Sequence, residues 1–288
     1  MTPSLLAAKL ILAPSLIAVV TLAGRRWGPS AAGWLAGLPI TGGPILAFLA
    51  IEQGLPFGQR AAVAALAGLL AFVAFCLAYA WSARRLPWYA ALPIGYAAYI
   101  LVGLPLTRWH PGAGVAACCG GACLLLGAWA MPRTRVVAHV VVAHPRWELP
   151  ARMAAAAVVV IVVTGLAAWL GPGWSGVLTV FPTAATALGV FTHHAAGPDA
   201  LAQLLRGLCL GMLGVTACFA VLGAGLERLG LGLGFTLGLL AAVAAQGATW
   251  LALRWFARRG AGFGFRVSGF GMRQHGRRRK EDPGTTPK

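Results

Sequence analysis

The chain has 288 residues, of which 59% are hydrophobic and only 10% charged, and its mean hydropathy is +0.79. A soluble domain carries about 25% charged residues, so this composition excludes an ordinary soluble fold. The net charge of +17 gathers at the ends of apolar runs and in residues 257–288, which is typical of a membrane protein and argues against a nucleic-acid partner.

Apolar runs of about 20 residues follow one another along the chain, each long enough to cross a bilayer core of about 30 Å as a helix. They lack the alternation expected of a membrane β-barrel. We therefore expect an all-α, polytopic transmembrane bundle of about nine spans. The expected spans are 4–23, 33–52, 61–82, 88–106, 113–131, 151–171, 173–192, 200–225 and 230–256.

Lysine and arginine are unevenly shared among the connections between these spans. They gather at 25–26, 84–85, 133–152 and in the tail, whereas the connections in between are poorer. The positive-inside rule then predicts a bacterial inner-membrane protein with a periplasmic N-terminus and a cytoplasmic C-terminus. The tail is expected to be disordered and to contact anionic lipid headgroups through its basic residues.

An internal repeat relates the two halves of the chain. Residues 33–54 and 173–197 share the order Gly-Trp, Pro, Phe, Gly, with Gly33 and Trp34 matching at an offset of 140 (173 − 33) and Pro39, Phe48 and Gly54 at 143 (182 − 39). One three-residue insertion reconciles the two offsets, although alanine- and leucine-rich helices also match by chance. Five spans precede the second copy, and an odd number inverts it in the membrane. The sequence therefore predicts two four-helix repeats of inverted topology joined by a connector helix.

These repeats define the expected domains. They are a first transmembrane repeat at 1–107, a connector helix and cytoplasmic loop at 108–149, a second repeat at 150–256, and the basic tail at 257–288.

The second span contains the run "GLPITGGP" at residues 37–44, and the seventh contains a proline at the matching depth. Proline removes a backbone donor and frees carbonyl groups that lipid cannot satisfy, so both interruptions must face protein or a watery cavity. Interrupted helices in two inverted halves indicate a transporter binding site, while the competing interpretation is that they only shape packing. The predicted substrate-binding residues are Pro39, Thr41, Gly42, Gly43, Pro44, Thr179, Phe181, Pro182, Thr183 and Thr186.

Ionisable and amide groups close the two interrupted spans. Glu52 and Gln53 end the second span, and His193 and His194 end the seventh; Arg206 lies inside the eighth. A histidine near neutrality or a desolvated carboxylate can couple to protons, and an intramembrane arginine usually faces a partner or cavity. These five are the predicted gating or proton-coupling residues. Contact with headgroups or water is the alternative for each of them.

Two further patterns bear on partners and cofactors. Gly230, Gly234 and Gly238 form a small-residue ridge, which favours a close helix contact within the chain or in a homodimer. Cys119 and Cys123 share a helical face, but the sequence offers no third ligand beside them, so neither a metal nor another cofactor is expected.

The stretch 174–212, "WSGVLTVFPTAATALGVFTHHAAGPDALAQLLRGLCLGM", resembles small bacterial inner-membrane proteins of the GlpM type. The similarity is carried by an aromatic residue, a small residue with glycine, the mid-span "FPT" and the following alanine/leucine segment with Arg206. That family is about one repeat long, so this chain looks like a duplicated and fused version of it. The resemblance implies that Phe181, Pro182 and Thr183 matter, and it associates the chain with exopolysaccharide production without supplying a substrate.

Three functions are compatible with these features. The first is a secondary transporter or permease that binds a small solute between the second and seventh spans. The alternative is a non-transporting membrane factor that supports cell-envelope or exopolysaccharide assembly. An intramembrane enzyme is not expected, because the chain has six acidic residues, six histidines and no HExxH or nucleophile–base spacing.

Overall fold

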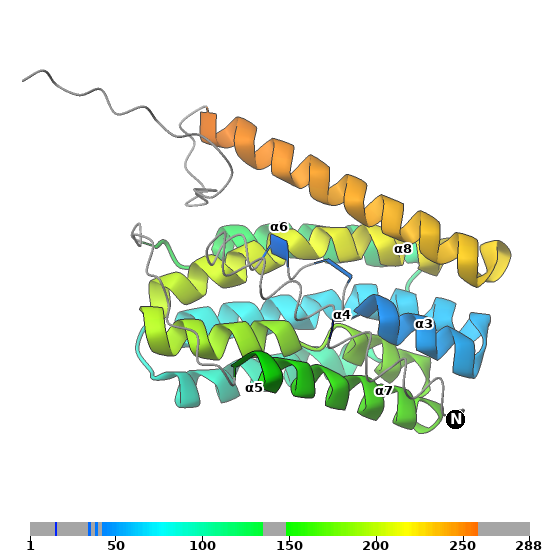
Figure 1. Ribbon diagram of the computed structural model, residues 1–288, viewed down its shortest axis with the longest axis horizontal. Coiled ribbons are helices and arrows are strands. Elements are labelled where there is room, and N and C mark those ends of the chain that lie inside the picture. The colour runs from blue at the N-terminus through cyan, green and yellow to red at the C-terminus, as the bar shows by residue number, and fades with distance from the viewer. Residues whose placement is uncertain (1–14, 16–33, 36–37, 40–41, 135–147, 259–288) are drawn as a thin grey trace, which may run out of the picture.

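The structure is a computed structural model that describes residues 15, 34–35, 38–39, 42–134 and 148–258. Helices dominate this part of the chain, and it contains no strand, which confirms the all-α prediction (Figure 1). The helices are α3 (Gly42–Gln53), α4 (Leu55–Ser82), α5 (Trp88–Leu106), α6 (Ala113–Ala130), α7 (Glu148–Thr179) and α8 (Thr183–Arg258). The predicted span 4–23, Thr41 and the tail beyond Arg258 lie outside the described residues.

Among the described residues, four helices are long and apolar enough to cross a membrane. They are α4, α5, α6 and the run Thr183–Trp255 of α8. Large apolar side chains also cover the outside of the bundle: Leu101 is 75% exposed, Trp129 71% and Trp169 90%. Since water disfavours such a surface and lipid does not, the structure supports a membrane location.

Single glycines bend the long helices without any intervening loop. Gly171 divides α7, Gly197 and Gly230 divide α8, and Gly54 separates α3 from α4; their φ angles are 71°, 81°, 74° and 92°. Side-chain-bearing residues are strained in this left-handed region, whereas glycine is not. The joints divide α7 into parts 148–170 and 172–179, and α8 into parts 183–196, 198–229 and 231–258.

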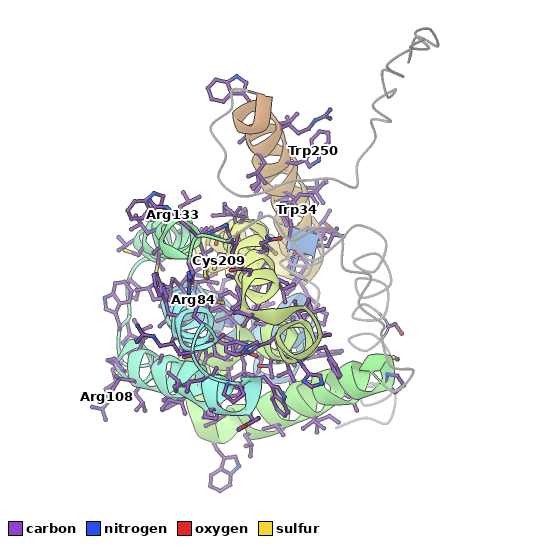
Figure 2. The ribbon with its side chains drawn as sticks, turned by 90° about the vertical axis from the view of Figure 1, so that its left-hand side faces the viewer. Trp34, Arg84, Arg108, Arg133, Cys209 and Trp250 are labelled. Atoms are coloured by element: carbon purple, nitrogen blue, oxygen red, sulfur yellow. The ribbon has the colours of Figure 1, made fainter. Side chains whose placement is uncertain are left out.

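Helix α4 is the centre of the bundle. It contacts α3, α5, α6, α7 and α8, and the end-on view in Figure 2 shows the other helices around it. Its buried positions are mostly small: Ala61, Ala62 and Ala65 are fully buried, and Gly68 receives Val177 and Val180 of α7 and the segment that follows. Small residues let helix backbones approach closely, which is how membrane helices pack without a hydrophobic driving force.

The middle part of α8 (198–229) runs antiparallel to α4. Gly58 of α4 lies against Leu226, and Val63 lies against Gly223, so numbers rise along one helix as they fall along the other. A hydrogen bond from the Glu227 backbone N–H to the Gln59 side chain, 2.9 Å long, joins the same ends.

The last part of α8 (231–258) packs one face on the middle part and leaves the other face exposed. A methyl group on Gly234 would lie 3.0 Å from Leu226, and one on Gly238 would lie 3.1 Å from Cys218. Two members of the predicted glycine ridge are therefore used inside the chain, and the third, Gly230, forms the joint. Figure 1 shows this part diverging from the bundle toward its far end.

Candidate binding site at two interrupted helices

The seventh predicted span is interrupted at residues 180–182. Part 172–179 ends there, and α8 begins at Thr183. The Phe181 backbone N–H donates to the Leu178 carbonyl at 3.0 Å, and the helix restarts when the Thr186 N–H donates to the Pro182 carbonyl at 2.8 Å. Pro182 has no N–H to continue the earlier helix, so the interruption lies where the sequence predicts it.

The second predicted span is interrupted in the same way. Leu38 and Pro39 lie outside any helix, and α3 begins at Gly42. The Leu38 N–H donates to the Leu35 carbonyl at 3.1 Å, and the Gly43 N–H donates to the Pro39 carbonyl at 3.0 Å.

The two interruptions meet. A methyl group on Gly42 would lie 3.3 Å from the carbonyl oxygen of Thr179 and 3.1 Å from Phe219. The amino end of α3 therefore rests on the carbonyl end of part 172–179. Val180 lies against Gly68, which is near the middle of the 28-residue α4, so the meeting point is about halfway along the bundle.

The predicted threonines at this point direct their hydroxyl groups at backbone carbonyls. Thr179 donates to Ser175 at 2.7 Å, and Thr186 donates to Pro182 at 2.8 Å. Thr179 and Thr183 are buried. Hydroxyl groups thus satisfy part of the backbone that the interruption leaves without helical partners.

Two tyrosines that sequence reasoning missed complete the second interruption. The Tyr96 ring stacks on Phe181 with centroids 5.6 Å apart, and Tyr99 meets the same ring edge-on at 5.5 Å. The Tyr96 hydroxyl shares a 2.7 Å hydrogen bond with Thr186, and the Tyr99 hydroxyl donates to the Val177 carbonyl at 2.8 Å. A buried tyrosine hydroxyl requires a partner, so tyrosines in the middle of an apolar span were the available indication.

Gln246 plays the corresponding part at the first interruption. It is buried in the last part of α8, and its side-chain N–H donates to the Trp34 carbonyl at 3.0 Å. A single amide in an apolar span usually marks a helix contact or a site, and this residue also was not among those predicted.

The predicted gating residues lie away from the interruptions. Glu52 and Gln53 end α3, about 15 Å beyond Gly42 at 1.5 Å per residue. Glu52 is half-buried, and Gln53 is exposed. His193 is buried near the end of part 183–196, with its ring 5.9 Å from that of Tyr79, whereas His194 is exposed.

Arg206 has a different environment from the one predicted. Its guanidinium group donates to the carbonyls of Ala128, Met131 and Pro132 at 3.1, 3.3 and 3.0 Å. These carbonyls belong to the end of α6, where a helix lacks backbone partners and carries partial negative charge. The contacts account for the burial of this arginine by capping α6.

No protein-family model, curated protein or solved structure matches the chain. The resemblance of residues 174–212 to the GlpM type therefore stays a prediction. What the chain does has to be argued from the meeting of its two interrupted helices.

Proposed function

We propose that the chain is a secondary transporter or permease of the bacterial inner membrane, with its solute site where the two interrupted helices meet. The observation that carries this proposal is the contact of Gly42 with Thr179 at the level of Gly68, halfway along the bundle. In known transporters of inverted repeats, discontinuous helices meet at mid-depth and supply backbone and hydroxyl groups to the solute.

Equivalent hydrogen bonds support the inverted duplication on which the proposal depends. The two interruptions carry the same pair of backbone hydrogen bonds, displaced by 143 residues (182 − 39). The equivalent pairs are Leu38 to Leu35 with Phe181 to Leu178, and Gly43 to Pro39 with Thr186 to Pro182.

Helix packing repeats with the same displacement. Gly54 and Gly197, 143 residues apart, are both joints with positive φ. A methyl group on the glycine at 95 or 238 would contact the two residues that correspond in the other half. These contacts are Gly95 with Phe75 and Tyr79, at 3.1 and 3.2 Å, and Gly238 with Cys218 and Leu222, at 3.1 and 3.5 Å.

The side-chain tethers change the expected alignment of the first interruption. Gln246 binds the carbonyl of Trp34, and Tyr99 binds that of Val177, again 143 residues later. Trp34 thus corresponds to Val177, and its match with Trp174 at an offset of 140 is not the structural one. The displacement of 143 holds from Trp34 onward without an insertion.

The directions of the two halves agree with inverted topology. From the interruption, α3 runs to the beginning of α4, where Ala50 contacts Gly58, whereas part 183–196 runs to the end of α4, where Gly189 contacts Tyr79 (Figure 1). Corresponding helices therefore point in opposite directions. We infer nine spans in two inverted four-helix repeats, with α6 as the connector, and alternating access by rocking of the repeats around the meeting point.

A flux measurement tests this site. We expect Pro182→Ala combined with Thr186→Ala to lower solute uptake into proteoliposomes about tenfold, because the change removes the interruption's geometry and the hydroxyl that binds Tyr96. Uptake of a solute library, with and without an imposed pH gradient, is measured by mass spectrometry for both proteins.

Pro105→Ala combined with Thr236→Ala is the matched control, because both residues are exposed on the bundle. Unchanged uptake in the Pro182 and Thr186 variant would remove the site from the proposal. If the wild-type protein moves no solute at all while it supports envelope or exopolysaccharide assembly in cells, the non-transporting alternative holds.

We infer that the end of the bundle carrying Arg84, Arg85 and Arg133, called here the arginine-rich end, faces the cytoplasm. Trp81 at the end of α4 donates to the Ala130 carbonyl of α6 at 3.2 Å, so these arginines gather at one end. A green fluorescent protein fused after residue 288 should therefore fluoresce, and alkaline phosphatase fused there should be inactive. Active phosphatase would invert the orientation.

A further inference from the structure

A row of four polar side chains connects the second interruption with the arginine-rich end. The row comprises Tyr96 and Thr186, joined by a 2.7 Å hydrogen bond, and Tyr79 and His193, whose rings meet in a T-shaped contact. Thr186 and His193 lie seven residues apart on one face of part 183–196. Gly189 lies between them, and the Tyr79 ring packs over it, 3.0 Å from where a Cβ would be.

The outer pair of the row carries two buried polar atoms that lack partners within the described part of the chain. They are the Tyr79 hydroxyl and the Nδ1 atom of His193. Tyr79 is fully buried, and His193 is 9% exposed. A buried polar atom without a partner is costly, so a third group should lie between these two residues.

The chemistry of the pair indicates what that group is. His193 makes a backbone hydrogen bond with Ala83. Since Nδ1 is free, this bond uses Nε2; donation to a carbonyl leaves Nδ1 as an acceptor. The Tyr79 hydroxyl can donate or accept. One hydroxyl group can donate to His193 and accept from Tyr79 at the same time.

The path offers no compensation for a charged solute. Tyr79, Tyr96 and Thr186 contact aromatic rings, a glycine, a hydroxyl and a carbonyl, all of them neutral or aromatic groups. The amino end of α3, which could attract an anion, already rests on the Thr179 carbonyl. An ion at this depth would therefore remain poorly solvated.

The other half of the chain argues that the row is not needed for packing. At a displacement of 143, every member has an apolar counterpart in the same scaffold. The counterparts of Tyr79, Tyr96, Thr186 and His193 are Leu222, Leu239, Gly43 and Ala50. Leu222 and Ala50 are buried like Tyr79 and His193, so the fold accepts apolar side chains at these places.

We propose that the row of Tyr79, Tyr96, Thr186 and His193 is the solute path between the interrupted helices and the arginine-rich end, and that it takes small uncharged solutes bearing hydroxyl groups. This inference rests on the proposed transport function and names its substrate class. The solute's hydroxyl groups bind first at Tyr79 and His193 and then at Tyr96 and Thr186, where they replace the hydrogen bond between those two side chains.

The test uses the purified full-length chain in proteoliposomes, with radiolabelled glycerol, erythritol and sorbitol as probes. We expect uptake of at least one polyol well above that of protein-free liposomes. Tyr79→Phe combined with His193→Leu should lower it at least fivefold, and Thr186→Val should lower it while Thr186→Ser restores it. Tyr89→Phe combined with His110→Leu is the matched control, because both residues are exposed.

Other outcomes overturn the inference. Equal polyol uptake in the row variant and the control takes the row off the path, provided that both elute as single species with similar unfolding temperatures. Uptake of ionic solutes only, still lowered by Pro182→Ala with Thr186→Ala, refutes the substrate class and leaves the transport function standing. If neither polyols nor ions move, both proposals fail.

Discussion

Arg206→Met should destabilise the folded chain by about 3–5 kcal/mol, because it removes three hydrogen bonds from a cation to the end of α6. The side chain of methionine fills a similar volume, so lost packing contributes little. What remains is a set of carbonyls at Ala128, Met131 and Pro132 that have lost this donor. The expected result is a marked fall in the unfolding temperature of the detergent-solubilised protein, measured by tryptophan fluorescence.

Arg228→Met, an exposed arginine on the same helix, is the control and should change the unfolding temperature little. The experiment also separates the cap from the gating role predicted by sequence. A gating arginine would give a variant of normal stability with altered flux, and that outcome would contradict the assignment of Arg206 as a cap of α6.

A single methyl group at Gly176 should cost about 3 kcal/mol or prevent folding. In Gly176→Ala the new carbon would overlap the Ala61 carbonyl oxygen and lie 2.5 Å from the Ala64 Cβ and 3.0 Å from the Ala65 backbone nitrogen. Backbone atoms of α4 cannot move aside as a flexible side chain can. The half-helix 172–179 would therefore have to withdraw from α4, and the meeting of the interruptions would be lost.

Gly247→Ala provides the comparison, because nothing lies within 4 Å of a Cβ at that exposed position of α8. Alanine is the better helix former by about 1 kcal/mol, so this variant should be neutral or slightly stabilised. Size-exclusion profiles and unfolding temperatures of the two variants give the answer. Equal stability would mean that part 172–179 does not lie tightly against α4.

The positions of the helices follow closely from the sequence, since hydropathy and helix breakers act locally. The expected spans 88–106 and 113–131 agree with α5 and α6 to within one residue. Helix α4 begins six residues before the expected 61, because a proline is accepted in the first helical turn and Arg60 does not end the helix. The interruption at Pro182 was predictable for the same local reason.

The site could be predicted only in part, because a sequence gives the depth of a residue in the membrane but not the direction in which its helix faces. Thr179 and Thr186 were found from their nearness to Pro182. Tyr96 and Gln246 belong to other helices, and only tertiary packing brings them to the interruptions. Arg206 was noticed, but its partners are backbone carbonyls, which no residue pattern reveals.

The one-residue joints at Gly54, Gly171, Gly197 and Gly230 leave the chain without slack between successive helices. Any tilt of part 183–196 must be passed to part 198–229 through the torsion angles of Gly197 alone. Each half should consequently swing as a lever, so that a cross-link placed between its neighbouring helices leaves turnover intact, whereas one placed between the two halves stops it.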